Sequence, residues 1–453
     1  MSSSRVLVVT LDTVADRMAG PAIRAWEISR ALSAQHDVTL VTFGRCTREG
    51  EGFVARRIEV GDFRTAVEAS DVVVVQGFVL NAFPWIQDCP QVLVVDLYDP
   101  FHIETLEVDR YKPDDERRRA VAFALAELGD QLRRGDFFLC ASGRQRDLWL
   151  GHLAAAGRLN PDTYDADPSL RSLIDLVPFG TPADPPRPTR HAIRGVVPGI
   201  GPDDKVIVWG GGVYNWFDPL SLIRAVDLVR AQVPEVRLYF LGMKHPNPDV
   251  PEMAVAAAAR RLADELGLTG SHVFFNEEWV PYEQRADWLC DADVGVSCHF
   301  THVETEFAFR TRVLDYLWAG LPIVSTEGDA FAALVAEHGL GAVVPAQDPH
   351  ALAEALISLL TTPAGDAARA AVARVAPRFT WPTVLAPLVA FCADPRRAAD
   401  AHRLPSLAAP AQAPRPGLVR RVRSDAAALV RHLRAGGVRQ VVAKVRWRLA
   451  RRR

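Results

Sequence analysis

The chain has 453 residues, of which 49% are apolar and 24% charged, with a formal net charge of -3. This length exceeds one ordinary hydrophobic core, and the composition is typical of a soluble globular enzyme, so we expect two domains. Six scattered cysteines without a CxxC pair argue against a disulfide framework or a zinc site. No stretch reaches the roughly 18 apolar residues of a membrane span, and the first apolar run is too short for a signal peptide. A cytoplasmic location is expected.

Short apolar runs alternate with helical patterns in the first half of the chain. The predicted strands are residues 5–11, 38–43, 72–77, 92–97, 137–141 and 176–178, and the predicted helices include 22–33, 114–133 and 144–155. Continuous Val and Leu runs between amphipathic helices are typical of a parallel sheet covered on both faces. The pattern stops at residues 180–189, where half of the residues are Gly or Pro and predict a linker.

The same alternation returns in the second half. The predicted strands are residues 206–209, 237–241, 272–275, 294–297, 322–325 and 342–344, and the predicted helices include 220–232, 254–266 and 352–360. The fold class is therefore α/β, with two Rossmann-like doubly wound parallel sheets. Ligands of such sheets bind beyond the carboxyl ends of the strands, so two facing sheets predict a cleft between the domains.

Residues 306–329 form the most informative segment of the sequence. They predict a loop, a short helix, a tight Gly-Leu-Pro turn and a buried strand. Arg310 and Arg312 stand near the start of that helix, where planar guanidinium groups can hold phosphate oxygens. Asp315 can accept hydrogen bonds from a ribose diol. A phosphate site beside a diol site indicates a nucleotide-sugar ligand.

The run Asp-Tyr-Leu-Trp-Ala-Gly-Leu-Pro at residues 315–322 resembles a motif of the GT-B glycosyltransferases of family 4. There an acidic residue stands ahead of Glu-Ala-Met-Ala-Ala-Gly-Leu-Pro. The resemblance covers residues 5–392 and implies sugar transfer from a nucleotide-diphosphate donor to an acceptor, with retention of configuration. It implies an acceptor-binding domain (1–183), a donor-binding domain (190–380) and a helix (381–392) that crosses back to the first domain.

Catalytic roles follow from the same resemblance. Arg310 and Arg312 would stabilise the departing diphosphate in place of a metal, so neither a metal nor another cofactor is expected. Family 4 enzymes carry a histidine near the reacting sugar, and His102, after the strand at 92–97, is our choice for it. Asp99 would orient this histidine or bind the acceptor. The alternative is that His102 is an ordinary structural histidine.

Four donor contacts are predicted around the glycine-rich turns. Gly20 and Arg24 follow the first strand, where a glycine lets the backbone approach phosphates and a helix N-terminus offers free amides. Gly211 and Gly212 follow the first strand of the second domain. Either turn could also be a tight connection without a ligand.

The second domain departs from the family pattern at two places. Residues 213–218 lack the Arg and Lys that hold the diphosphate in many family 4 enzymes, which makes Lys244 a further candidate. The first acid of the motif is out of register, and Glu306 is favoured over Glu304 for the sugar hydroxyls. Val280 is predicted to read the edge of the nucleobase through its backbone.

The C-terminal segment is strongly basic. Residues 393–417 are rich in Ala and Pro and predict a flexible linker. Residues 416–453 hold twelve Lys and Arg and one acid, and an apolar stripe runs along the predicted helical tail at 418–453. This pattern predicts an anionic membrane surface as partner and a peripheral position on the inner face of the cell membrane. A merely solvated tail is the alternative, and nucleic acid is not expected because aromatic residues are scarce there.

The functional prediction is a hexosyltransferase that acts in cell-envelope or other glycoconjugate synthesis on a glycan, lipid-linked or small-molecule acceptor. Two alternatives stay open at this stage. A sugar-nucleotide epimerase of GT-B fold would need no acceptor, and a catalytically inactive membrane-associated scaffold would bind the donor without turnover.

Overall fold

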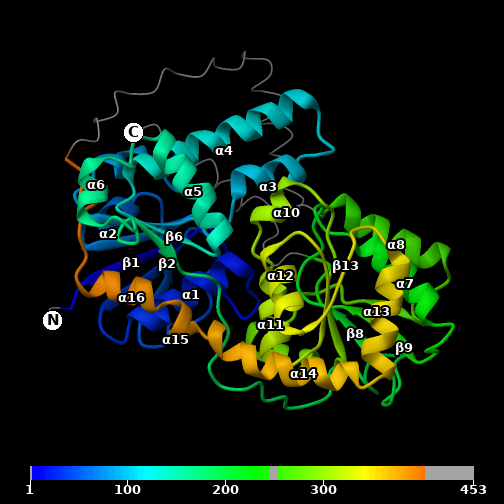
Figure 1. The fold of residues 1–453 in the computed structure, drawn as a ribbon. Helices are drawn as coiled ribbons and strands as arrows, with labels where there is room; N and C mark the ends of the chain where they lie inside the picture. The colour runs from blue at the N-terminus through cyan, green and yellow to red at the C-terminus, as the bar shows by residue number, and fades with distance from the viewer. Residues whose placement is uncertain (1–2, 245–251, 403–453) are drawn as a thin grey trace, which may run out of the picture.

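The computed structural model describes residues 3–244 and 252–402. In this part of the chain two lobes lie side by side, and each is a parallel sheet with helices on both faces (Figure 1). The predicted α/β class with two doubly wound domains is confirmed. The predicted tail at 418–453 and most of the linker at 393–417 lie outside the described residues. No helix within the described ranges is long and apolar enough to span a bilayer.

The first domain contains a seven-stranded sheet in the order β3-β2-β1-β4-β5-β6-β7. Its strands are β1 (Arg5–Thr10), β2 (Asp37–Thr42), β3 (Val54–Arg57), β4 (Val72–Gln76), β5 (Val92–Asp96), β6 (Phe137–Cys140) and β7 (Ile174–Leu176). All neighbours pair in parallel. The sequence analysis missed β3 because this edge strand is mostly exposed and has no continuous apolar run.

Helices cover both faces of this sheet. They are α1 (Gly20–Leu32), α2 (Phe63–Glu68), η1 (Pro84–Asp88), α3 (Phe101–Val108), α4 (Asp114–Arg134), α5 (Gly143–Ala155) and α6 (Pro161–Ala166). Trp26 of α1 is fully buried and packs edge-on against Phe53, with ring centroids 4.9 Å apart. A loop of residues 11–19 joins the end of β1 to the start of α1, so the N-terminus of α1 lies at the carboxyl edge of the sheet.

The second domain contains a six-stranded sheet in the order β10-β9-β8-β11-β12-β13. Its strands are β8 (Lys205–Trp209), β9 (Val236–Phe240), β10 (Val273–Phe275), β11 (Val294–Ser297), β12 (Ile323–Thr326) and β13 (Gly341–Val344). Its helices are α7 (Pro219–Val229), α8 (Ala254–Glu265), η2 (Tyr282–Gln284), α9 (Arg285–Leu289), α10 (Val303–Phe307), α11 (Thr311–Ala319), α12 (Ala330–His338), α13 (Pro349–Thr361), α14 (Ala364–Val375) and η3 (Ala376–Phe379). Each strand expected from the sequence is present.

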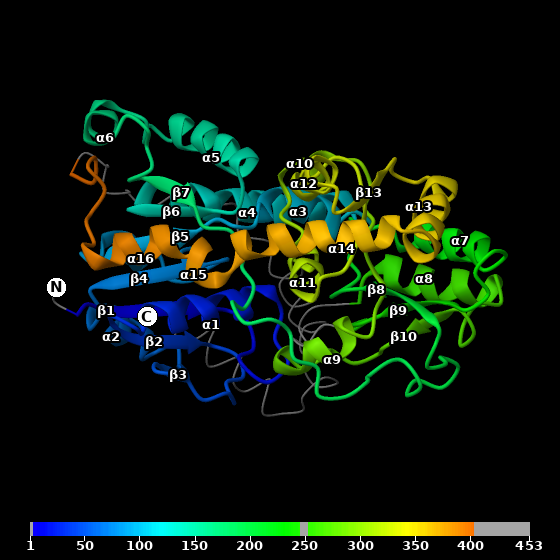
Figure 2. The same cartoon turned by 60° about the horizontal axis from the view of Figure 1, so that its bottom comes forward.

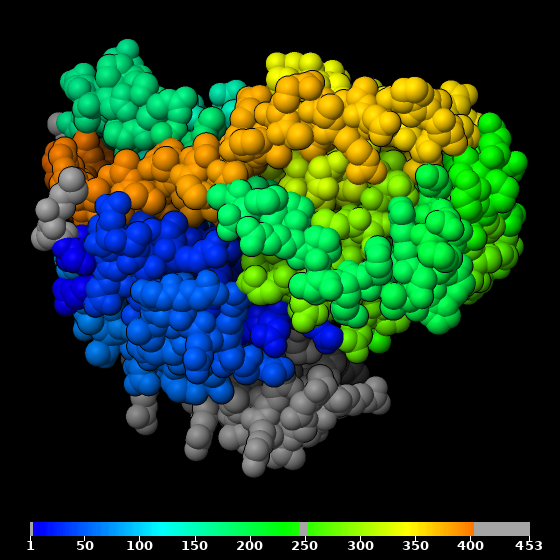
Figure 3. Space-filling model, turned by 90° about the horizontal axis from the view of Figure 1, so that it is seen from below, coloured from blue at the N-terminus to red at the C-terminus, as the bar shows by residue number. Residues whose placement is uncertain are grey.

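The chain then returns to the first domain. Figure 2 shows α14, α15 (Trp381–Val384) and α16 (Ala386–Ala393) running across both lobes, and Figure 3 shows the same orange segment on the surface. Phe391 stacks on Phe137 of β6, with ring centroids 4.3 Å apart. Trp381 packs on Phe179 at 4.8 Å. These aromatic contacts join the end of the described chain to the first sheet.

Polar contacts also join the two lobes beside the cleft. The indole N–H of Trp279 donates to the carbonyl of Met18 at 3.1 Å, and the amide of Tyr282 donates to the carbonyl of Asp16 at 2.9 Å. On the other side, the Gln145 amide group donates to the carbonyl of Phe307 at 2.8 Å. The loops that follow the strands of each sheet therefore touch and enclose a space between them.

Candidate functional site

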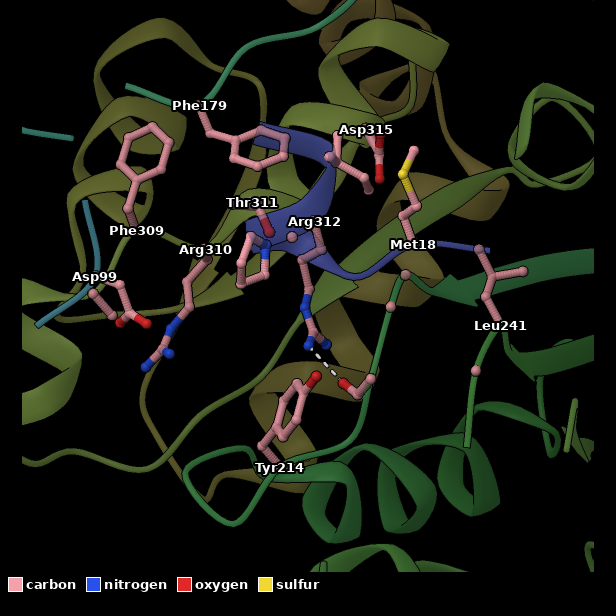
Figure 4. A pocket seen from close by; sticks show the side chains of 18 of the residues that line it. Met18, Asp99, Phe179, Tyr214, Leu241, Phe309, Arg310, Thr311, Arg312 and Asp315 are labelled. Atoms are coloured by element: carbon pink, nitrogen blue, oxygen red, sulfur yellow. Dashed lines mark hydrogen bonds between the residues drawn. The ribbon is translucent and has the colours of Figure 1, made fainter. Parts of the chain in front are cut away.

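A cavity of about 340 Å³ lies between the lobes, at the carboxyl ends of both sheets (Figure 4). The first domain contributes loops after β1, β5 and β7 and the first turns of α1 and α3. Its lining residues are Met18, Gly20, Pro21, Ile23, Tyr98, Asp99, Glu104, Phe179 and Gly180. The second domain contributes loops after β8, β9, β10 and β11. Its lining residues are Gly210, Gly211, Gly212, Tyr214, Trp216, Phe217, Leu241, Gly242, Trp279, Val280, Tyr282, Arg285, Ala308, Phe309, Arg310, Thr311, Arg312 and Asp315.

The glycine loop after β8 brings main chain to the cavity. The Gly210 amide donates to the Tyr316 hydroxyl at 2.7 Å, which fixes the start of the loop. Gly211 has φ +74°, a left-handed conformation that favours glycine, and open space surrounds the position of a Cβ there. A Cβ on Gly212 would lie 2.9 Å from the Tyr214 ring. The loop thus exposes backbone where side chains would fill the space.

Arg312 is a buried cation that has no carboxylate partner among the described residues. It lies in the first turn of α11, is 7% exposed, and its guanidinium lies 3.8 Å from the Phe217 ring centroid. One terminal nitrogen donates to the Gly212 carbonyl at 2.8 Å, and the other, Nη1, has no hydrogen-bond partner. Among the described residues no carboxylate pairs with it. Burial lowers its pKa to about 10, so it stays protonated at neutral pH.

The neighbouring Arg310 is neutralised within the protein. Its two terminal nitrogens donate to the two Glu304 oxygens, each at 2.7 Å, and the side chain is 4% exposed. Bidentate pairs of this kind hold both groups in one orientation. In α10 the Glu304 side chain is buried, whereas Glu306 is exposed and does not line the cavity. The preference for Glu306 is therefore corrected, because a helix places residues two apart on different faces.

Asp315 faces the cavity one turn after Arg312. Its Oδ1 accepts from Nε of Arg285 at 3.2 Å, and 38% of the side chain is exposed. The Arg285 guanidinium packs against two aromatic rings. Its Cζ atom lies 3.9 Å from the Tyr282 ring centroid and 4.4 Å from the Trp318 ring centroid. The aspartate is thus oriented by a fixed cation and keeps accessible oxygen for hydroxyl donors.

A pair of carboxyl groups lines the opposite wall. Asp99 follows β5, Glu104 lies in the first turn of α3, and the two side chains hydrogen-bond to each other. Burial, followed by the nearby Asp99 carboxylate, raises the pKa of Glu104 well above its ordinary value. Burial also raises the pKa of Asp99. The hydrogen bond between them raises the pKa of Glu104 and lowers that of Asp99, so it favours a proton on Glu104.

Comparison with known proteins is informative once this geometry is described. Residues 204–362 match the family model of the glycosyl transferases group 1. The matched residues lie within the second domain and include the wall formed by Gly210, Arg312 and Asp315.

The wider comparisons agree with the group 1 family. A D-inositol 3-phosphate glycosyltransferase 2 of Catenulispora acidiphila is 28% identical over 221 residues, which cover 48% of this chain and 49% of that protein. The chain spans about half the length of the curated relatives it matches. Among solved structures, an Anabaena protein, HepE, in complex with UDP and glucose superposes with a TM-score of 0.58 at 13% identity. That match covers 86% of this chain and 99% of the other.

A second solved structure shows the same two-domain fold. Sucrose-phosphate synthase from Thermosynechococcus elongatus superposes with a TM-score of 0.56 at 15% identity, over 84% of this chain and 96% of that one. At such low identity the likeness establishes the GT-B architecture for the whole described chain, and the family model adds the group 1 character of the second domain.

Eight of the residues predicted for the site line the cavity. Gly20 begins α1 on the first-domain wall, and Val280 follows Trp279 on the second-domain wall. The others that the structure brings there are Asp99, Gly211, Arg310, Arg312 and Asp315, and Gly212 joins them as the acceptor for Arg312.

Besides Glu306, three predicted residues lie outside the cavity lining. Arg24 is fully buried under Tyr98, where it pairs with Asp96 at 2.6 Å and donates to two main-chain carbonyls, so it cannot reach a donor. His102 packs against Trp149 and His152, and burial lowers its pKa to about 4. Neither His102 nor the exposed Lys244 lines the cavity. The structure thus places these three side chains outside the cavity lining, because sequence position alone does not say which way a side chain points.

Sequence reasoning missed Glu104. Its position could have indicated a site residue. Glu104 lies in the first turn of α3, the helix that follows β5, and such a turn lies at the same carboxyl edge of the sheet as Asp99. The sequence analysis favoured Glu306 over Glu304. Only the folded structure shows that Glu304 is the acid that pairs with Arg310.

Proposed function

We propose that this protein transfers a glycosyl group from a nucleoside-diphosphate sugar to an acceptor in the cleft. The observation that carries the proposal is the buried guanidinium of Arg312 beside a glycine loop. Within residues 3–244 and 252–402, one of its terminal nitrogens has no hydrogen-bond partner and no carboxylate pairs with it. Burying an unpaired charge is unfavourable unless a ligand supplies the counter-charge. A diphosphate fits this requirement, and the HepE structure with UDP and glucose supports the same ligand class.

Each part of a nucleotide sugar then has a place on the second wall. The diphosphate would lie against Gly211, the Arg312 guanidinium and the N-terminus of α11, a nine-residue helix whose first amides are free to donate to an anion. The ribose hydroxyls would donate to Asp315. The base would lie along Val280, with Trp279 and Tyr282 flanking it.

The residues of this chain also suggest how the transfer is assisted. As the bond between sugar and diphosphate breaks, negative charge grows on the leaving oxygen, and the Arg312 cation stabilises that charge from a fixed position. The contacts from Trp279 to Met18 and from Gln145 to Phe307 keep the lobes together, which excludes water from the reacting sugar. Arg310, already paired with Glu304, serves to shape the pocket more than to bind phosphate.

Several finer features belong to the same proposal. Retention of configuration and transfer without a metal rest on the resemblance to family 4. An acceptor at an anionic membrane surface in glycoconjugate synthesis rests on the basic sequence after residue 416. A truncation that ends at residue 402 tests the latter, because loss of vesicle binding with retained UDP binding would separate the tail from the catalytic domains.

Titration of the purified full-length protein with UDP, GDP, dTDP and ADP tests the donor site. Wild type should bind at least one of them, whereas Arg312→Met should bind it far more weakly. Arg56→Met, on the exposed edge strand β3, is the matched control and should bind like wild type. Equal affinity of wild type and Arg312→Met would overturn the proposal. Release of free nucleoside diphosphate only when acceptor is present would separate transfer from epimerisation.

A further inference from the structure

We propose that Tyr214 is a second ligand of the diphosphate, and that its hydroxyl donates to the phosphate that carries the transferred sugar. The inference rests on the proposed function and adds a phosphate-binding residue to its donor site. Its basis is a phenol that lines the cavity beside Arg312, in a loop, residues 213–218, that contains no Lys or Arg (Figure 4).

A single guanidinium does not satisfy a diphosphate, because each of its two phosphates carries negative charge. Among the described residues two other arginines line the cavity, and both are engaged. Arg310 is bound by both oxygens of Glu304. Arg285 donates to Asp315. Neutral donors, such as hydroxyl groups and main-chain amides, must therefore supply the remaining contacts to the phosphates.

Tyr214 is held in place by an aromatic stack. Its ring lies parallel to that of Trp216, with centroids 4.8 Å apart and an interplanar angle of 7°, and Phe217 packs against both. All three side chains line the cavity. The Phe217 ring centroid also lies 3.8 Å from the Arg312 guanidinium, so one aromatic cluster fixes both groups. A donor that is fixed in advance loses little conformational entropy when a ligand binds.

The Tyr214 hydroxyl lies at the glycine turn. A Cβ on Gly212 would lie 2.9 Å from the hydroxyl oxygen, so this oxygen sits against the main chain of the turn. Between the residues drawn in Figure 4, a hydrogen bond runs from Arg312 to the Gly212 carbonyl and none leaves the phenol. Burial raises the pKa of the phenol, and the nearby Arg312 cation only partly opposes this shift. The hydroxyl therefore keeps its proton at neutral pH and is available as a donor.

The order of the groups along the wall assigns the phosphate. In Figure 4 the Asp315 carboxylate and the Tyr214 hydroxyl lie on opposite sides of the Arg312 guanidinium. A nucleotide sugar with its ribose at Asp315 would pass Arg312 with its diphosphate and reach Tyr214 with the phosphate that bears the sugar. Negative charge grows on that phosphate as its bond to the sugar breaks, so the hydrogen bond from Tyr214 strengthens as the leaving group departs.

Calorimetric titration of full-length Tyr214→Phe tests the assignment, because phenylalanine keeps the ring stack and removes only the hydroxyl. The probes are UDP, GDP, dTDP and ADP, with the corresponding monophosphates measured by competition. The variant should bind the preferred diphosphate about tenfold more weakly than wild type, as expected for a lost hydrogen bond to a charged group. Its affinity for the monophosphate should stay close to that of wild type. Tyr164→Phe, an exposed tyrosine on α6, is the matched control and should bind both nucleotides like wild type.

The results for Tyr214→Phe and Arg312→Met together separate this inference from the donor site itself. Unchanged diphosphate affinity in Tyr214→Phe, beside a large loss in Arg312→Met, would overturn the role of Tyr214 and leave the donor site standing. An equal loss for diphosphate and monophosphate would assign the effect to the shape of the pocket and would also overturn that role. A wild type that binds none of the four diphosphates would overturn both proposals.

Discussion

The two walls of the cleft have the same architecture and opposite chemistry. Both are built from loops at the carboxyl ends of parallel strands, and both begin with a glycine turn. The second-domain wall presents an unpaired guanidinium, Arg312, and open backbone at Gly211. The first-domain wall presents two carboxyl groups, Asp99 and Glu104, that hydrogen-bond to each other and have raised pKa values. The fold thus decides where ligands bind, and a few side chains decide which ligand each wall accepts.

The largest effect should come from removing the unpaired cation. Arg312→Met should weaken binding of the preferred nucleoside diphosphate about 100-fold or more, because a buried charge-assisted contact is lost. Isothermal titration calorimetry measures the loss, with Arg56→Met as control. Arg310→Met is the comparison variant, because Arg310 is already paired with Glu304. A larger loss of UDP affinity in Arg310→Met than in Arg312→Met would contradict the assignment of Arg312 as the phosphate ligand.

The next effect concerns the ribose. Asp315→Asn should weaken binding of UDP by about tenfold, since a hydrogen bond to a charged acceptor is replaced by one to a neutral group. Binding of 2′,3′-dideoxy-UDP should change little, because that ligand lacks the hydroxyl donors. The ratio of the two affinities, measured for wild type and variant, isolates the contact. An equal loss for both ligands would place Asp315 in a purely structural role with Arg285.

A smaller effect is expected from the glycine loop. A Cβ on Gly212 would lie 2.9 Å from the Tyr214 ring, so Gly212→Ala should displace the ring and weaken UDP binding severalfold. Gly151→Ala is the matched control in α5, where a Cβ meets nothing within 4 Å. That control should raise the free energy of unfolding by about 1 kcal/mol, because alanine favours helix more than glycine does. Unchanged UDP affinity in Gly212→Ala would show that the ring yields without disturbing the loop.

The smallest effect is a change in the pH dependence of stability. The pKa of Glu104 is raised in the folded protein, so between its unfolded and folded pKa values the folded state binds more protons. Its contribution to the free energy of unfolding therefore decreases as pH rises through that interval, by at most about 1.4 kcal/mol per pH unit.

Glu104→Gln removes this titration. The free energy of unfolding of the variant relative to wild type should thus increase from pH 5 to pH 8, which urea denaturation at each pH can measure. Asp96, Glu304 and Arg310 also act on this site, so the slope and not the absolute stability is the quantity to compare. A difference that stays constant across this range would contradict the raised pKa of Glu104.

The sequence by itself determined the architecture and most of the donor wall. Apolar runs and helical periodicity are local properties, so every strand except the exposed edge strand β3 was placed. Glycine turns and the charged helix start at Arg310 and Arg312 lie within short segments, and their position at strand ends follows from the topology of a parallel sheet.

Only the tertiary structure decided the partners of the charged groups. Arg310 and Arg312 are two residues apart, yet one is bound by Glu304 and the other reaches the Gly212 carbonyl one hundred residues away. Arg24 is taken by Asp96, and Glu104 meets Asp99 across a turn. The energy of a charge depends on its burial and on nearby groups brought together from distant segments, and neither property can be read from the local pattern that sets the elements.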